Sequence, residues 1–126
     1  MDLLDTNVYS LIGDEGFARL TAAFFRHVPT DPILGPMYEH DLAGAEWRLR
    51  EFLVGRFGGP MRYVERRGHP RLGMRHARFK IDKTARDRWV STMLQALDAA
   101  KFPPEAHRPL HQFFEQAATF LINRPG

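Results

Sequence analysis

The sequence predicts an all-α fold, and three observations support this. Apolar residues recur every three or four positions in the long segments, and no segment alternates apolar and polar residues as a half-buried strand does. Glycine and proline residues separate these segments. With 44% hydrophobic and 12% aromatic residues, 126 residues suffice for a buried core. We therefore expect one domain spanning residues 1–126.

Two helices are expected before the first proline. Thr6 or Asn7 can cap a short helix that ends at Gly13, and Asp14 suits the first turn of a longer helix that ends at Pro29. The longer helix should bury a single stripe of side chains, formed by Phe17, Leu20, Thr21, Phe24, Phe25 and Val28.

A short turn and a third long helix should follow. Asp31 can cap a brief turn that reaches Leu34 and stops at Gly35-Pro36. The next helix is predicted from Leu42 to Phe57, with an inward face formed by Leu42, Ala45, Leu49, Phe52, Leu53 and Phe57. Its outward face is expected to carry Glu46, Arg50 and Glu51.

The segment after this helix is the least regular in the chain. Gly58-Gly59-Pro60 is a strong stop signal, so we expect a loop to follow. His69-Pro70 favours extended backbone, which leaves room for only a short helical piece within 71–77. Leu72 and His76 lie four residues apart in that piece and would share one face.

Two helices should complete the chain. Asp82 is the expected cap of a helix that runs to about Lys101, with an apolar side formed by Trp89, Val90, Met93, Leu94 and Leu97. Pro103-Pro104 ends it. Because Pro109 would remove a main-chain bond and kink the second turn, regular helix is expected only from about Arg108. The last apolar stripe is Leu110, Phe113, Phe114, Ala117, Leu121 and Ile122.

The positive charge of the chain is concentrated in one region. Residues 62–88 hold ten Arg or Lys against three acidic residues, a local charge of +7, whereas the whole chain carries +3. Such clustering with interleaved aromatic residues fits a nucleic-acid surface, or a solvated face with a few arginines bound to the carboxylates of a ligand.

Other features limit the function classes. Without cysteine the chain has no disulfide and no thiolate ligand. No apolar run approaches the length of a membrane span, so we expect a cytoplasmic protein without membrane insertion. His107, His111 and Glu115 have zinc-like spacing, but Pro109 disturbs the geometry and no further ligand is evident.

His76 is the most interesting titratable residue of the basic segment. A histidine on a short helical turn, beside a leucine and between arginines, can serve as an axial iron ligand with nearby cations for haem propionates. A hydrogen-bonded structural histidine explains the same pattern. The residues alone leave both interpretations open.

Several motifs, in this order and spacing, resemble the group II (O-type) truncated haemoglobins of bacteria. They are Asp41-Leu42-Ala43-Gly44-Ala45-Glu46, Arg48-Leu49-Arg50, Phe52-Leu53, Gly58-Gly59-Pro60, Gly68-His69-Pro70-Arg71-Leu72, Arg75-His76-Ala77, Phe79, Arg86-Asp87 and Trp89. The resemblance covers essentially the whole chain. It implies a truncated globin fold, a two-over-two helical sandwich, with haem b (iron protoporphyrin IX) as the cofactor.

The resemblance also implies roles for individual residues. His76 would be the proximal iron ligand, and the hydrogen-bond donors to a distal ligand would be Trp89 and Tyr38. Ala45 falls where oxygen-carrying haemoglobins usually place a distal histidine, and Leu49 would cover the distal face. The residues expected to contact haem are Arg48 and Arg75 at the propionates, Tyr63 more weakly, and Leu72, Phe52 and Met93 near the ring.

Three departures from the family pattern stand out. Phe25 occupies the position of a common distal tyrosine, so one hydroxyl is missing. The loop from Tyr38 to Leu42 is one residue shorter than usual, which affects where the Tyr38 hydroxyl lies. The early diglycine of many truncated haemoglobins appears as Gly13-Asp14, so the first helix is expected to pack differently.

The implied function is reversible binding of dioxygen and other diatomic ligands. The alternative is a haem enzyme with nitric oxide dioxygenase or peroxidase-like activity, which would need an external reductant and thus an unidentified reductase. The resemblance favours haem anchorage over nucleic-acid binding for the basic segment. It is compatible with a monomer or a homodimer.

Overall fold

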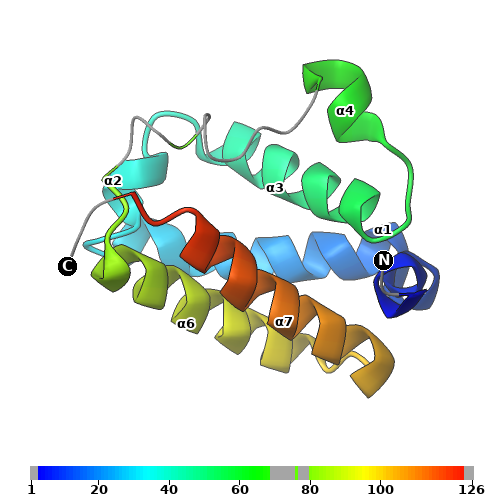
Figure 1. The fold of residues 1–126 in the computed structure, drawn as a ribbon. Coiled ribbons are helices and arrows are strands. Elements are labelled where there is room, and N and C mark those ends of the chain that lie inside the picture. Colours follow the sequence, from blue (N-terminus) through cyan, green and yellow to red (C-terminus); the bar gives the residue numbers. More distant parts are fainter. Residues whose placement is uncertain (1–2, 69–75, 77–79, 124–126) are drawn as a thin grey trace.

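The computed structural model describes residues 3–68, 76 and 80–123, and every regular element within these ranges is a helix (Figure 1). Helix α1 spans Leu3–His27, so it begins before the predicted caps at Thr6 or Asn7. At Gly13 the backbone leaves helical geometry (φ 64°, ψ −176°), a conformation that glycine adopts without steric cost. The predicted boundary at Gly13 is therefore confirmed.

A one-turn 3₁₀ helix, η1 (Val28–Thr30), follows α1. The carboxylate of Asp31 then accepts the N–H groups of Ile33 and Leu34 at 2.8 and 2.9 Å, as expected for a cap. The predicted stop at Gly35-Pro36 is wrong, because helix α2 (Gly35–Tyr38) begins there. Pro36 fits the first turn of a helix, where its missing N–H has no intrahelical partner to lose.

Helix α3 (Leu42–Arg56) agrees closely with the prediction. Asp41 caps it by accepting the N–H of Gly44 at 3.0 Å. One residue of its supposed outward face was misplaced: Glu51 is only 6% exposed. Its carboxylate is covered by a helix that the sequence did not predict.

That helix is α4 (Arg62–Arg67), in the segment expected to be a loop. Arg62 makes charge-assisted hydrogen bonds at 2.5 Å to Glu51 on α3 and to Asp14 on α1. Asp14 also accepts the hydroxyl of Tyr9 at 3.1 Å. One arginine thus joins three helices, which explains how a six-residue helix is held in place.

Helices α6 (Lys83–Ala100) and α7 (Pro104–Phe120) form an antiparallel pair. Asp82 caps α6 through the N–H of Ala85 at 2.9 Å, as predicted. Helix α7 begins at Pro104 and not near Arg108, so that prediction is wrong. The carbonyl oxygen of Pro103 accepts the backbone N–H groups of Ala106 and His107 at 2.9 Å, which stabilises the first turn. Pro109 lacks an N–H, so it removes one main-chain hydrogen bond later in the helix.

The helices form the predicted two-over-two arrangement. In Figure 1, α3 lies over the long part of α1, and α6 and α7 lie below, with α1 in contact with both members of the lower pair. Large side chains without solvent exposure fill the space between the pairs: Phe17, Leu20, Phe24, Leu53, Phe57, Met93, Leu97, Leu110 and Phe114. This core fixes the positions of the helices that carry the site.

Candidate functional site

A hydrogen bond joins two of the predicted distal residues. The indole Nε1–H of Trp89, in the second turn of α6, donates to the hydroxyl oxygen of Tyr38, the last residue of α2, at 3.2 Å. Both side chains are half-buried. Two residues that are 51 positions apart in sequence therefore form one polar pair.

The Tyr38 hydroxyl keeps its own proton at neutral pH. Burial raises the pKa of this phenol, and the hydrogen bond from Trp89 offsets that effect only in part. Because the oxygen accepts from the indole, its O–H remains a donor for another group. The single N–H of Trp89, in contrast, is already engaged by Tyr38.

An ion pair beside this hydrogen bond holds α6 against the turn that precedes α2. Arg88 Nε donates to Asp31 Oδ2 at 2.7 Å, while the other oxygen of Asp31 caps the turn. Burial would raise the pKa of Asp31, but its two backbone N–H donors and the Arg88 guanidinium outweigh burial and hold the pKa below its usual value. The charged carboxylate thus fixes the spacing between α2 and Trp89.

Aromatic rings surround the polar pair. Phe25 packs edge-on against Tyr38, with ring centroids 5.3 Å apart, and is itself only 5% exposed. Phe24 and Phe114 pack against Trp89 with centroid distances of 5.2 and 5.8 Å. Phe25, which has no hydroxyl, therefore directly contacts the residue that does carry one.

The three apolar site residues predicted on α3 lie on its core side. Ala45 is buried, and Leu49 and Phe52 are half-buried and pack against the core. Phe52 contacts Tyr63 of α4 edge-on, with ring centroids 5.9 Å apart, and Tyr63 is 5% exposed. Met93 of α6 is fully buried in the core.

His76 is helical and half-buried. Its carbonyl oxygen lies 3.4 Å from the carboxamide Nδ2 of Asn123, which donates to it. Of the other residues predicted in this segment, Leu72 and Arg75 lie outside the described residues.

Arg48 lines a basic cavity of about 390 Å³ between α3 and α4. Its guanidinium lies 3.3 Å from the carboxylate of Asp41. The pKa of Asp41 is lowered, mainly by the hydrogen bond from the backbone N–H of Gly44 and secondly by the hydrogen bond from Arg48. The remaining lining residues are Gly44, Trp47, Arg66 and Arg67. Arg66 also stacks over the Trp47 ring at 4.9 Å. Three arginines and the single carboxylate of Asp41 give this cavity a net positive lining, which suits a carboxylate-bearing ligand.

The sequence did not single out several of these residues. Arg66 and Arg67 belong to the basic cluster of residues 62–88. Because helix α4 was not predicted, the sequence did not indicate that these two residues line the same cavity as Arg48. The Arg88–Asp31 ion pair spans 57 positions and left no local signal.

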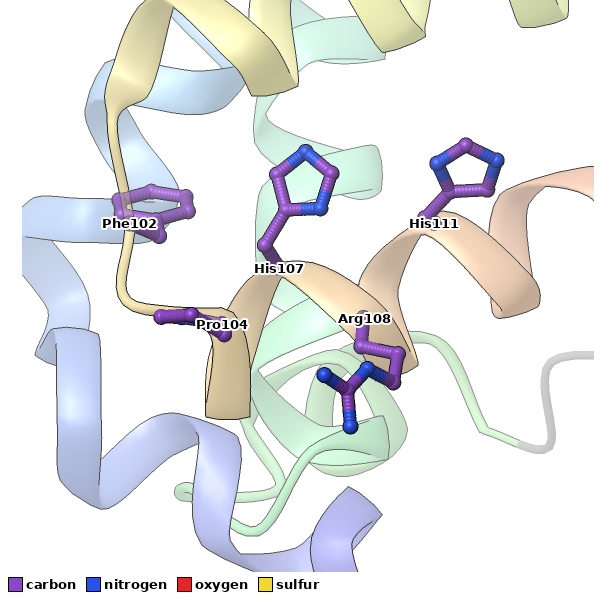
Figure 2. A pocket seen from close by; sticks show the side chains of 5 residues that line it. All are labelled: Phe102, Pro104, His107, Arg108 and His111. Atoms are coloured by element: carbon purple, nitrogen blue, oxygen red, sulfur yellow. The ribbon is translucent and has the colours of Figure 1, made fainter.

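A second cavity, of about 510 Å³, lies at the start of α7, at the end of the α6–α7 pair away from α2 (Figures 1 and 2). In Figure 2 the His107 and His111 rings project from one side of α7, and Arg108 lies on the other. The Nε2 atom of His107 lies 2.9 Å from the carboxylate of Asp98, and the Nε2 atom of His111 lies 3.1 Å from the carboxylate of Glu115. Within the described ranges, no three His, Asp or Glu side chains form a group that could hold a metal.

The sequence profile of the bacterial-like globins matches residues 7–123. The chain belongs to this globin family. Group 2 truncated hemoglobin YjbI of Bacillus subtilis is 33% identical to this globin over 116 residues, which cover 92% of the chain and 88% of that protein.

Solved structures agree with this assignment. A thermostable hemoglobin from Thermobifida fusca matches with a TM-score of 0.90 and 43% identity, over 94% of this globin and 98% of that chain. The truncated oxygen-avid haemoglobin from Bacillus subtilis matches with a TM-score of 0.87 and 33% identity, over 92% and 98% of the two chains. Among the described helices of this globin, none is both long and apolar enough to cross a bilayer.

Proposed function

We propose that this globin binds haem b with His76 as the iron ligand, and that it reversibly binds dioxygen and other diatomic ligands. The observation that carries this proposal is the Trp89–Tyr38 hydrogen bond, a pair of polar hydrogen-bonding groups set among packed phenylalanines. Haem supplies an iron centre at which such small ligands bind. The truncated relative from Bacillus subtilis is described as oxygen-avid, which agrees with this choice.

The residues fit the cofactor by their chemistry. A neutral imidazole suits iron, and this chain has no cysteine that could take its place. The cavity lined by Arg48, Arg66 and Arg67 suits the two propionates, which need cationic, bidentate partners. Buried Tyr63 and half-buried Phe52 offer an aromatic surface next to the α3–α4 junction. Arg75 and Leu72 remain expected contacts by resemblance alone.

Tyr38 and Trp89 have different tasks in this proposal. Tyr38 presents its O–H to the ligand, because its oxygen already accepts the indole N–H. Trp89 orients that hydroxyl and polarises it, since successive hydrogen bonds strengthen one another. Phe25 excludes water beside Tyr38 and contributes no donor of its own. Ala45 and Leu49 leave the α3 side apolar.

Replacing the proposed iron ligand tests the central claim. We expect His76→Ala to lose stoichiometric haem or to hold it only loosely, and added imidazole to restore part of the Soret absorption. His27→Ala is the matched control, because His27 is exposed at the end of α1 and should leave the spectrum unchanged. A stable five-coordinate ferrous spectrum of His76→Ala without imidazole would exclude His76 as the ligand.

A further inference from the structure

Asn123 connects the end of the chain to the segment that contains His76. It lies just beyond α7, and in Figure 1 the red end of α7 runs beside the yellow-green start of α6. Its backbone N–H donates to the carbonyl of Ile81 at 2.8 Å, and its side-chain Oδ1 accepts the Ile81 N–H at 2.9 Å. Asn123 therefore satisfies both main-chain polar groups of Ile81, a residue that is only 7% exposed.

The same carboxamide reaches His76. Its Nδ2 donates to the His76 carbonyl oxygen at 3.4 Å, across 47 positions in sequence. A carboxamide offers an acceptor and a donor at once, whereas a carboxylate offers only acceptors. The side chain thus links the backbone of His76 to the residue that precedes Asp82, the cap of α6.

We propose that Asn123 is the positioning residue of the proximal segment, in that its carboxamide holds the His76 backbone against the start of α6. This inference rests on the proposed role of His76 as the iron ligand. Trp89 is carried by the same helix, so His76 and the Trp89 indole share one support. In this inference Asn123 acts on the cofactor through the backbone of His76.

Two substitutions separate the two halves of the carboxamide. Asn123→Asp keeps an acceptor for the Ile81 N–H and removes the donor to His76, whereas Asn123→Ala removes both. Gln116→Ala is the control, because Gln116 is exposed on the adjoining helix α7. In the haem-free protein, amide hydrogen exchange at Ile81 should accelerate in Asn123→Ala and stay close to wild type in Asn123→Asp.

The haem-loaded protein provides the second measurement. Loss of one hydrogen bond corresponds to roughly a fivefold change in an equilibrium, so both Asn123 variants should release haem to an excess of a haem acceptor about fivefold faster than Gln116→Ala. The iron–histidine stretching band of the ferrous protein should move in both variants, because the imidazole is held in a different orientation.

The outcomes separate this inference from the proposed function. Amide exchange at Ile81 could accelerate in Asn123→Ala while haem release and the iron–histidine band of both variants match wild type. In that case Asn123 only binds the Ile81 backbone, and the inference is wrong. Unchanged exchange in Asn123→Ala would also overturn it. If wild type itself shows no iron–histidine band, the role of His76 fails first, and this inference fails with it.

Discussion

Replacing Trp89 by phenylalanine tests how the distal pair retains dioxygen. The substitution keeps an aromatic ring between Phe24 and Phe114 but removes the indole N–H that donates to Tyr38. We expect this variant to release dioxygen faster than wild type, because the Tyr38 hydroxyl loses the donor that orients it.

The magnitude follows from the hydrogen bonds involved. A donor to a ligand of partial negative charge contributes about 1.5–3 kcal/mol, which is roughly a tenfold to hundredfold change in dissociation. In this globin the indole N–H donates to Tyr38 and not to the ligand, so its removal weakens the Tyr38 donor without deleting it. We therefore expect a change near the lower limit, about tenfold.

Stopped-flow dissociation of dioxygen, with Tyr38→Phe and the double variant measured alongside, provides the assay. If the indole acts through the hydroxyl, the double variant should release dioxygen little faster than Tyr38→Phe alone. Phe25→Tyr should slow release if the new hydroxyl reaches the ligand. Tyr9→Phe is the control, because Tyr9 bonds Asp14 on α1. Equal dissociation rates for Trp89→Phe and wild type would show that the Trp89 indole does not help Tyr38 to retain dioxygen.

Two further predictions concern the ion pairs that hold the site. Arg62→Met should lower the free energy of unfolding, measured by urea titration, by about 1–2 kcal/mol. The loss should be smaller than for a fully buried ion pair, because the Arg62 side chain is 40% exposed. Replacing Glu51 by Met as well should recover much of this loss, because no buried carboxylate is then left without its partner. Asp31→Asn keeps the cap but loses the charge opposite Arg88. Because the folded-state pKa of Asp31 is lowered, its stabilising effect is present at neutral pH and lost as the pH falls through that value. Urea midpoints of wild type and Asp31→Asn should differ at pH 7 and converge in acid, and a constant difference would contradict the assignment.

The sequence alone determined the features that depend on near neighbours. The caps at Asp31 and Asp82 and the break at Gly13 are local, because a side chain or a backbone conformation decides each within three or four residues. The buried stripes of the long helices are periodic for the same reason, and their all-α arrangement follows from packing those stripes together.

Motif order carried more information than periodicity did. The order and spacing of the glycine, proline and histidine motifs were enough to indicate the globin family, whereas a lone histidine such as His76 is chemically ambiguous. The distal roles of Trp89 and Tyr38 were expected by resemblance, but only the folded chain brings the indole within 3.2 Å of the hydroxyl.

Tertiary structure decided the features that depend on residues far apart in sequence. Helix α4 is too short to be stable alone, and it forms where Arg62 meets Glu51 and Asp14. Glu51 looked like a surface residue because its burial comes from that unpredicted helix. The link from Asn123 to His76 depends on the end of α7 reaching the start of α6. Such contacts leave no periodic trace in the sequence, because each joins residues whose distance along the chain is set only by the completed fold.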